Sequence, residues 1–323
     1  SLGAGNGVVD PLAEGLRPFL EAFGGRQTQF ELSGTIQVPI DGKEQTVTLQ
    51  LVRFDDEAFD LALTHDEYAL SIRRRHETTA FALPLHNVVF IGSGQVSSNE
   101  SLKPGGIASR LLSPGSQAAM FAPLVLQADP DAISAALKGF AGAVFDPESN
   151  HWSAGNVNFG FGSKGWINIQ SGKADIKLTI KSAVPKQEAA SNWPGMKPVS
   201  LLRDEIERQL VRGVRRAFET LAPSPVLTNP PQSSRKVAHG ELRWIGGQRV
   251  ALLSGSPEEV GRAHGELLKA EAGRCIDSVL YTFGTAQTIR TGRWFRSDLD
   301  AAYKRLAPHI PERHKRETRA MAA

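Results

Sequence analysis

The sequence has 323 residues, a formal net charge of +3, 41% hydrophobic residues, 22% charged residues and one cysteine. This length allows about two domains of ordinary size, and the composition excludes a disordered polyelectrolyte and a fibrous repeat. A single cysteine excludes a disulfide within the chain and any metal site with several cysteine ligands. Because no apolar run is long enough to cross a bilayer, we expect no transmembrane segment.

Charge is distributed unevenly along the chain. Residues 1–199 hold 16 Lys and Arg against 20 Asp and Glu, whereas residues 200–323 hold 21 against 14. This change of sign indicates two units of different character. The later cations are scattered among acidic residues and lack the aromatic platforms of nucleic-acid readers, so we expect no nucleic-acid partner. No motif in the sequence points to a cofactor or a resident metal.

The first 186 residues are predicted to form an α+β domain. A helix is expected over residues 11–23, and apolar and polar residues then alternate over residues 27–91, as in half-buried strands joined into an antiparallel meander. The pair Asp41-Gly42 predicts a hairpin turn between two of these strands. Apolar spacing of three and four over residues 105–142 predicts inserted short helices, and alternation then returns and ends near Val184.

This order of elements resembles the half-barrel of periplasmic lipoprotein carriers and related lipid-binding proteins. The resemblance covers about residues 10–185, concerns the architecture only, and implies an apolar concave face that suits an acyl or lipid chain or another protein segment. The alternative is that the helices predicted over residues 105–142 cover this face and leave no open cavity.

Two short patterns in this domain have simpler structural explanations than ligand binding. Residues 160–165 read Gly-Phe-Gly-Ser-Lys-Gly and match the dinucleotide fingerprint, but a strand pattern follows them where the fingerprint needs a helix. We therefore predict a hairpin turn there. The run Arg73-Arg74-Arg75 cannot form one anion-binding claw, because alternate side chains of a strand point to opposite faces; a solvated strand end is expected.

A polar, proline-bounded stretch predicts a linker over residues 187–199. Ser200 then reads as the N-cap of an amphipathic helix that ends at Ala222-Pro223. Residues 200–323 are accordingly predicted to be a second, mainly helical region.

The most informative motif follows a short strand that begins at Arg249. It reads Gly255-Ser256-Pro257, then Glu259, and predicts a helix over residues 257–284 that starts with a capping box. Gly261 and Gly265 lie four residues apart, so they clear one face of this helix for the close approach of another backbone. His264 lies between them in the sequence.

This Gly-Ser-Pro-x-Glu-Val-Gly-x-x-His-Gly segment is followed by a long predicted helix, a basic stretch and the segment from Ile310 to Ala322. Together these resemble the opening of autoproteolytic acyltransferases related to penicillin acyltransferase. The resemblance covers about 75–85 residues from near Leu252. It implies the leading part of an αββα N-terminal-nucleophile (Ntn) hydrolase, in which a precursor cleaves itself before a cysteine that then forms an acyl thioester.

The resemblance implies a nucleophilic cysteine after the helical region, and this sequence has no cysteine there. Cys275, the only thiol, falls within the predicted helix and is expected to be structural. His264 is a candidate for lining the site of the assembled enzyme, with a helix-packing role as the alternative. No residue is therefore assigned as catalytic, and the motif residues Gly255, Ser256, Pro257, Gly261, His264 and Gly265 are expected to be structural.

These observations lead to two hypotheses of function. The first is the leading chain of a cysteine-nucleophile amidohydrolase or acyltransferase that acts on an acyl amide or thioester, with a missing catalytic part or subunit as its partner. The second is a lipid- or lipoprotein-binding module without catalysis. The chain begins with Ser and ends without a helix stop signal, so we expect processed or truncated ends, and the lipid-carrier resemblance implies an extracytoplasmic location.

Overall fold

The structure is a computed structural model that describes residues 10–23, 29–40, 42–97, 100–103, 130–140, 142–149, 151–154, 156–162, 165–172, 174–221 and 234–323. The chain divides into two compact units, Ser1–Val211 and Arg212–Ala323, which we call the sheet unit and the helical unit. The division falls inside helix α5 (Arg203–Leu221), later in the chain than the predicted linker at residues 187–199.

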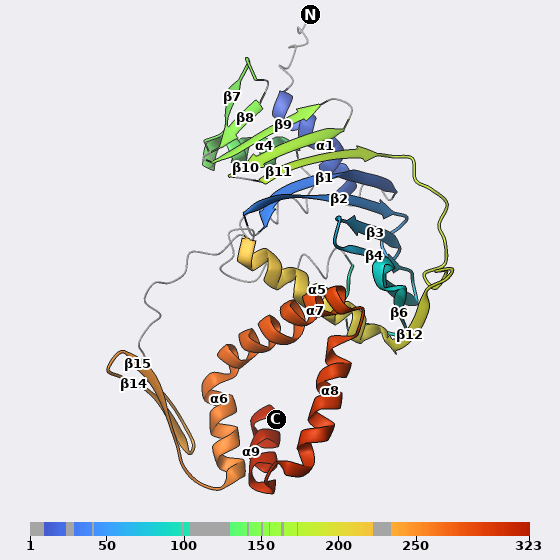
Figure 1. The fold of residues 1–323 in the computed structure, drawn as a ribbon. Helices are drawn as coiled ribbons and strands as arrows, with labels where there is room; N and C mark the ends of the chain where they lie inside the picture. The colour runs from blue at the N-terminus through green and yellow to red at the C-terminus, as the bar shows by residue number, and fades with distance from the viewer. Residues whose placement is uncertain are drawn as a thin grey trace, which may run out of the picture. The chain divides into compact units, whose positions relative to one another are not determined.

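The sheet unit is built on one sheet of twelve strands, in the order β12-β6-β5-β4-β3-β2-β1-β11-β10-β9-β8-β7 (Figure 1). All neighbouring strands are antiparallel except β12 and β6, which are parallel. The strands are β1 (Phe30–Ile40), β2 (Lys43–Arg53), β3 (Phe59–Thr64), β4 (Ala69–Arg74), β5 (Thr78–Leu83), β6 (Val88–Ser93), β7 (Val144–Asp146), β8 (His151–Ala154), β9 (Val157–Gly162), β10 (Trp166–Ser171), β11 (Ala174–Lys181) and β12 (Lys197–Leu202). The predicted α+β class and the hairpin of residues 30–53 are confirmed.

Helix α1 (Pro11–Phe23) covers the apolar face of the central strands. Period two places Leu32 of β1 opposite Ile180 of β11 on that face, and both pack with Phe19 and Ala22 of α1 in a buried cluster. Burial of the larger side chains, Phe19, Leu32 and Ile180, stabilises the unit by about 1.5–3 kcal/mol each. The alternation read from the sequence therefore identifies the face that forms the core.

A second helix of the sheet unit is α4 (Pro130–Phe140), which contacts α1. It confirms the last of the helices predicted between residues 105 and 142; the earlier part of that prediction, residues 104–129, lies outside the described residues. The glycine pattern at residues 160–165 joins β9 to β10, which pair as antiparallel strands. The hairpin prediction is confirmed.

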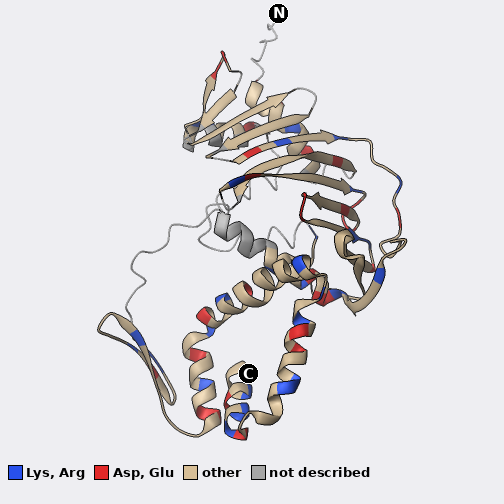
Figure 2. Cartoon of the chain, viewed as in Figure 1, with Lys and Arg blue, Asp and Glu red and all other residues tan. Residues whose placement is uncertain are grey.

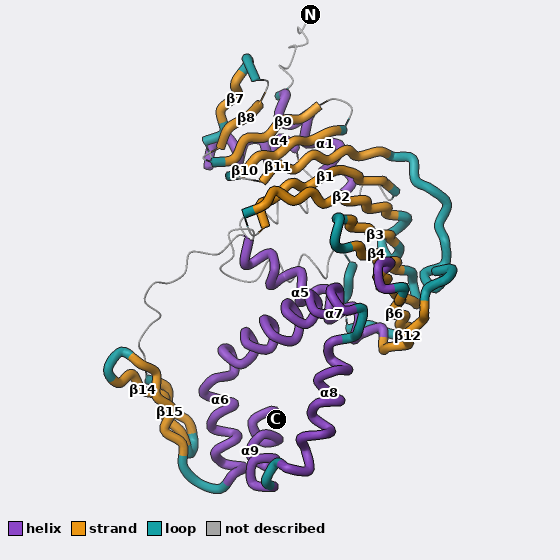
Figure 3. The backbone as a smooth tube through the Cα atoms, in the orientation of Figure 1, coloured by secondary structure: helices purple, strands orange, loops and turns teal. Residues whose placement is uncertain are grey.

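The predicted helix start at Ser200 was wrong. Ser200 lies in β12, opposite Ile91 of β6, and α5 begins at Arg203. The stretch before it, shown as a loop between β11 and β12 in Figure 3, carries the buried side chain of Ala190 against β5 and β6. Pairing with a strand more than a hundred residues earlier supplies backbone hydrogen bonds that the local pattern does not reveal.

The helical unit combines a three-stranded antiparallel sheet with a series of helices. Its elements are β13 (Arg235–Val237), β14 (Gly240–Ile245), β15 (Gln248–Leu253), α6 (Pro257–Ile276), the π-helical segment η3 (Asp277–Phe283), α7 (Gly284–Thr291), α8 (Phe295–Leu306) and α9 (Glu312–Ala322). Acidic and basic residues are interspersed along α6 and α8 (Figure 2). None of the helices in the described parts of the chain is long and apolar enough to cross a membrane.

Candidate functional site

The motif at the start of α6 forms the predicted capping box. The Ser256 side chain accepts a hydrogen bond from the backbone N–H of Glu259, and the Glu259 carboxylate accepts one from the backbone N–H of Ser256 at 2.7 Å. Pro257 occupies the first helical turn. Gly255 has φ +119°, a conformation that other residues rarely adopt. The capping box, Pro257 and Gly255 thus determine that α6 begins directly after Ser256.

His239, which the sequence analysis did not single out, joins the same cluster from the turn between β13 and β14. Its Nε2 lies 3.4 Å from Oε1 of Glu259, and its backbone carbonyl accepts a hydrogen bond from the N–H of Ser254. The hydrogen bonds from Ser256 and the charge of His239 hold the pKa of Glu259 below its ordinary value. The helix start is therefore connected to the neighbouring sheet through an exposed contact between His239 and Glu259.

Gly261 and Gly265 perform the role that their spacing predicts. A Cβ at Gly261 would overlap the backbone carbonyl oxygen of Glu317 in α9, and a Cβ at Gly265 would lie 2.6 Å from the carbonyl oxygen of Met321. The two glycines therefore allow the backbones of α6 and α9 to touch. The prediction that this face admits another backbone is confirmed, and the partner is α9.

The two candidate reactive residues of α6 differ from what catalysis would need. His264 is half-buried, and within the described chain no hydrogen bond or ion pair involves its ring. Cys275 lies near the end of α6, within the helix that the sequence predicts, and it is exposed. The structural role expected for it stays a prediction. Among the described residues, none makes a hydrogen bond or ion pair with its thiol that would activate it as a nucleophile.

In the sheet unit, a cavity of about 620 Å³ lies between α1 and the ends of β9 and β11. Phe161 and Ile180 contribute apolar surface to its lining, which also includes Arg17, Glu14 and Glu21, and Arg17 pairs with Glu14 at 2.8 Å. Gly15 brings α1 close to β9, because a Cβ there would overlap the Phe161 side chain. The volume is within the range of small-molecule sites, about 300–1,000 Å³.

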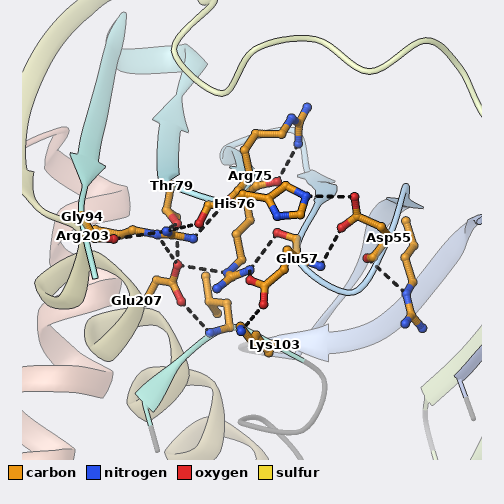
Figure 4. A network of polar contacts seen from close by, with 12 residues as sticks. Asp55, Glu57, Arg75, His76, Thr79, Gly94, Lys103, Arg203 and Glu207 are labelled. Atoms are coloured by element: carbon orange, nitrogen blue, oxygen red, sulfur yellow. Dashed lines mark hydrogen bonds and ion pairs between the residues drawn. The ribbon is translucent and has the colours of Figure 1, made fainter. Parts of the chain in front are cut away.

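A buried network of charges fixes the first part of α5 to the sheet (Figure 4). Glu207 is fully buried, and its Oε1 accepts hydrogen bonds from Nε of Arg74 and of Arg203, each at 3.0 Å, and from the Thr79 hydroxyl at 2.5 Å. Its Oε2 accepts the backbone N–H of Leu102 at 2.8 Å. Because both oxygens are occupied by donors, this carboxylate serves as an anchor and not as a general base.

A second carboxylate extends the network toward the surface. Glu57 accepts a hydrogen bond from Nη1 of Arg74 at 2.8 Å and pairs with Lys103. Burial opposes its ionisation, but the bonds from Lys103 and Arg74 outweigh that effect and hold the pKa of Glu57 below its ordinary value. The expected solvated strand end at Arg73–Arg75 was wrong, since Arg74 is only 1% exposed.

The neighbouring arginines point the other way, as the strand geometry requires. Arg73 stacks on the Trp193 ring at 4.1 Å and donates to the carbonyl oxygen of Asn192, whereas Arg75 donates to that of Glu188. These contacts hold the segment between β11 and β12 against the sheet. Arg74 thus binds α5 on one face of the end of β4, and Arg73 and Arg75 bind the segment between β11 and β12 on the other face.

Comparison with models of known protein families and with curated proteins finds no match for this chain. In the described part of the chain, no three His, Cys, Asp or Glu residues come together as possible metal ligands.

Proposed function

We propose that this chain is the leading part of an autoproteolytic, cysteine-nucleophile amidohydrolase or acyltransferase that acts on acyl amides or thioesters. The observation that carries the proposal is the contact between α6 and α9. The two segments on which the resemblance rests, one around Gly261 and the other from Ile310 onward, pack together through the motif glycines. Two segments about fifty residues apart in the sequence therefore belong to one structural motif.

In this proposal, the chain supplies a scaffold and not the nucleophile. The only cysteine is exposed on a helix, whereas the chemistry needs a cysteine whose own freed amine can act as its base. The proposed nucleophile therefore belongs to sequence that follows α9. The capping box and the glycine contact would hold α6 and α9 in one fixed arrangement beside it.

Intact-mass spectrometry on the product of the complete reading frame tests this proposal. We expect two chains, the second of which begins with Cys, and a single uncleaved chain when that cysteine is replaced by alanine. An uncleaved product with no cysteine downstream of α9 would overturn the proposal. Separation of the cell fractions would test the extracytoplasmic location that we propose with it.

A second candidate function, lipid binding, is favoured by the cavity beside α1. Phe161 and Ile180 contribute apolar surface to its lining, which suits an acyl chain, whereas Arg17 in the same lining is paired with Glu14 at 2.8 Å. We expect delipidated full-length chain to bind a fluorescent fatty acid, and Ser182→Trp at the cavity lining to block that binding. Ser297→Trp on the exposed side of α8 is the matched control and should leave binding unchanged.

A further inference from the structure

The two sheets of the described chain end in four edge strands, and three of these carry features that oppose the addition of another strand. Strands β7 and β13 have only three residues each, and β13 also carries Arg235 and Lys236. Strand β12 contains Pro198, which has no N–H to donate. Short length, basic side chains and proline are the usual protection of a sheet edge.

Strand β15, the fourth edge, lacks this protection. In the described part of the chain it pairs with β14 alone. It has six residues, contains no proline and ends in the apolar run Val250–Leu253. Its only charged residue, Arg249, pairs with Glu271 of α6 at 2.6 Å, whereas Leu252 on the opposite face is 44% exposed. An unprotected apolar edge of this kind is a template for another strand.

The hydrogen bonds of the β14–β15 hairpin show which backbone groups of β15 face the open edge. The N–H of Ser254 donates to the carbonyl oxygen of His239 at 3.0 Å, directly beyond the last paired residues of the two strands. Successive residues of an antiparallel strand bond alternately to one side and the other, so the even-numbered residues of β15 bond to β14. The N–H and C=O groups of Arg249, Ala251 and Leu253 therefore point to the open edge.

We propose that β15 pairs with β15 of a second copy of this chain, in antiparallel orientation around a two-fold axis at Ala251. In this register Ala251 lies opposite its own copy, and Arg249 lies opposite Leu253 of the other copy on each side of the axis. All three are residues whose backbone groups face the edge, so each opposed pair exchanges two N–H···O bonds. The two three-stranded sheets would become one continuous sheet.

The side chains of β15 suit a second copy of the same strand. In this register Val250 lies opposite Leu252 of the other copy, so an apolar cross-strand pair forms on each side of the axis. No like charges meet, because Arg249 lies opposite Leu253. A two-fold pair that uses the same patch on both copies is also the commonest closed assembly of soluble proteins.

Light scattering and sedimentation of the full chain over a wide range of concentration test the proposal. We expect a mass that rises to twice the 34.9 kDa of one chain. Leu252→Lys should weaken the dimer by about tenfold or more, because both apolar pairs are lost. Val250→Glu combined with Leu252→Lys should restore it through opposite charges across the axis. Tyr303→Lys, which replaces an exposed apolar residue of α8, is the matched control and should dimerise as the original chain does.

Cross-linking tests the register in a Cys275→Ser background. The Cα atoms of a hydrogen-bonded antiparallel pair lie about 5.5 Å apart, which is within the range of a disulfide. Ala251→Cys should therefore give a disulfide-linked dimer on oxidation. Leu252→Cys is the control one residue away, and it should not cross-link because it faces Val250 of the other copy.

Dimerisation that responds to the substitutions in β15, or cross-linking at Ala251 and not at Leu252, supports the proposal even if Leu252→Lys does not fold. A chain that stays monomeric at every concentration would overturn it, and so would a dimer that neither the β15 substitutions nor the cross-linking locate at this edge. Slow hydrogen exchange at the Ala251 amide of a monomer would identify another occupant of the edge and would equally exclude the second copy.

Discussion

Helices α5 and α6 are held in their units by contacts of opposite kinds. The first part of α5 carries a buried carboxylate, Glu207, that is surrounded by two buried arginines. The first part of α6 instead presents two glycines that let the backbone of α9 touch it. A buried ion network is costly to break because a charge is left without a partner, whereas a glycine contact fails when any side chain is added. The two helices should therefore respond to quite different substitutions.

The largest expected effect is at Glu207. Glu207→Ala leaves Arg74 and Arg203 buried without their shared carboxylate, and we expect a loss of about 3–5 kcal/mol of folding free energy. Urea unfolding followed by circular dichroism measures it. Glu188→Ala removes an exposed partner of Arg73 and should cost at most about 1 kcal/mol. Equal effects of the two substitutions would show that the Glu207 network is not the anchor of α5.

A smaller effect is expected at Gly261. In Gly261→Ala the new methyl group meets the carbonyl oxygen of Glu317, and overpacking of this kind costs about 1–3 kcal/mol. We also expect faster hydrogen exchange in α9, measured by mass spectrometry.

The matched control for this substitution lies in the same helix. Nothing lies within 4 Å of a Cβ at Gly273, so Gly273→Ala should stabilise α6 by about 1 kcal/mol through helix propensity alone. If Gly261→Ala were equally stabilising, the close contact between α6 and α9 would be refuted.

The capping box contributes less than either contact. Ser256→Ala removes the acceptor for the backbone N–H of Glu259, and the loss should be about 1 kcal/mol. Thermal unfolding of the variant measures this loss. Ser297→Ala on the exposed side of α8 should change stability by less than about 0.5 kcal/mol, and a similar loss from both would argue against a capping role.

The smallest effect concerns pH. The pKa of Glu57 is lowered in the folded chain, so its ionised form contributes stability that is fully present above the ordinary carboxylate pKa of about 4.3 and is lost as the pH falls through the lower folded value. Glu57→Gln should therefore weaken the acid-induced loss of stability below that pH. Unfolding curves that fall equally steeply for both proteins would contradict this assignment.

Much of the fold was predictable because the signals were local. Alternation in residues 30–53 predicted the first hairpin, and the residues Ser256, Pro257 and Glu259 predicted the start of α6. The spacing of Gly261 and Gly265 predicted a close backbone contact but could not name its partner. That partner, α9, is about fifty residues away, and nothing in either segment specifies the pairing.

The sites were less predictable than the elements. The sequence predicted that Arg74 points to the opposite face from Arg73 and Arg75, because successive side chains of a strand alternate between its two faces. The burial of Arg74 could not be inferred, because it depends on Glu207, which is 133 residues later in the chain. His239 likewise gave no signal, as its partner Glu259 is brought near it only by the packing of β13–β15 on α6.

The sequence by itself determined the strands within residues 30–91 and 157–180, their apolar faces and the start of α6, because each of these follows from contacts within a few residues. Only the tertiary structure decided that residues 197–202 join the sheet as a parallel strand and that Glu207 becomes a buried anchor. These outcomes depend on groups that are distant in the sequence, and their hydrogen bonds and desolvation are set only when the chain has packed.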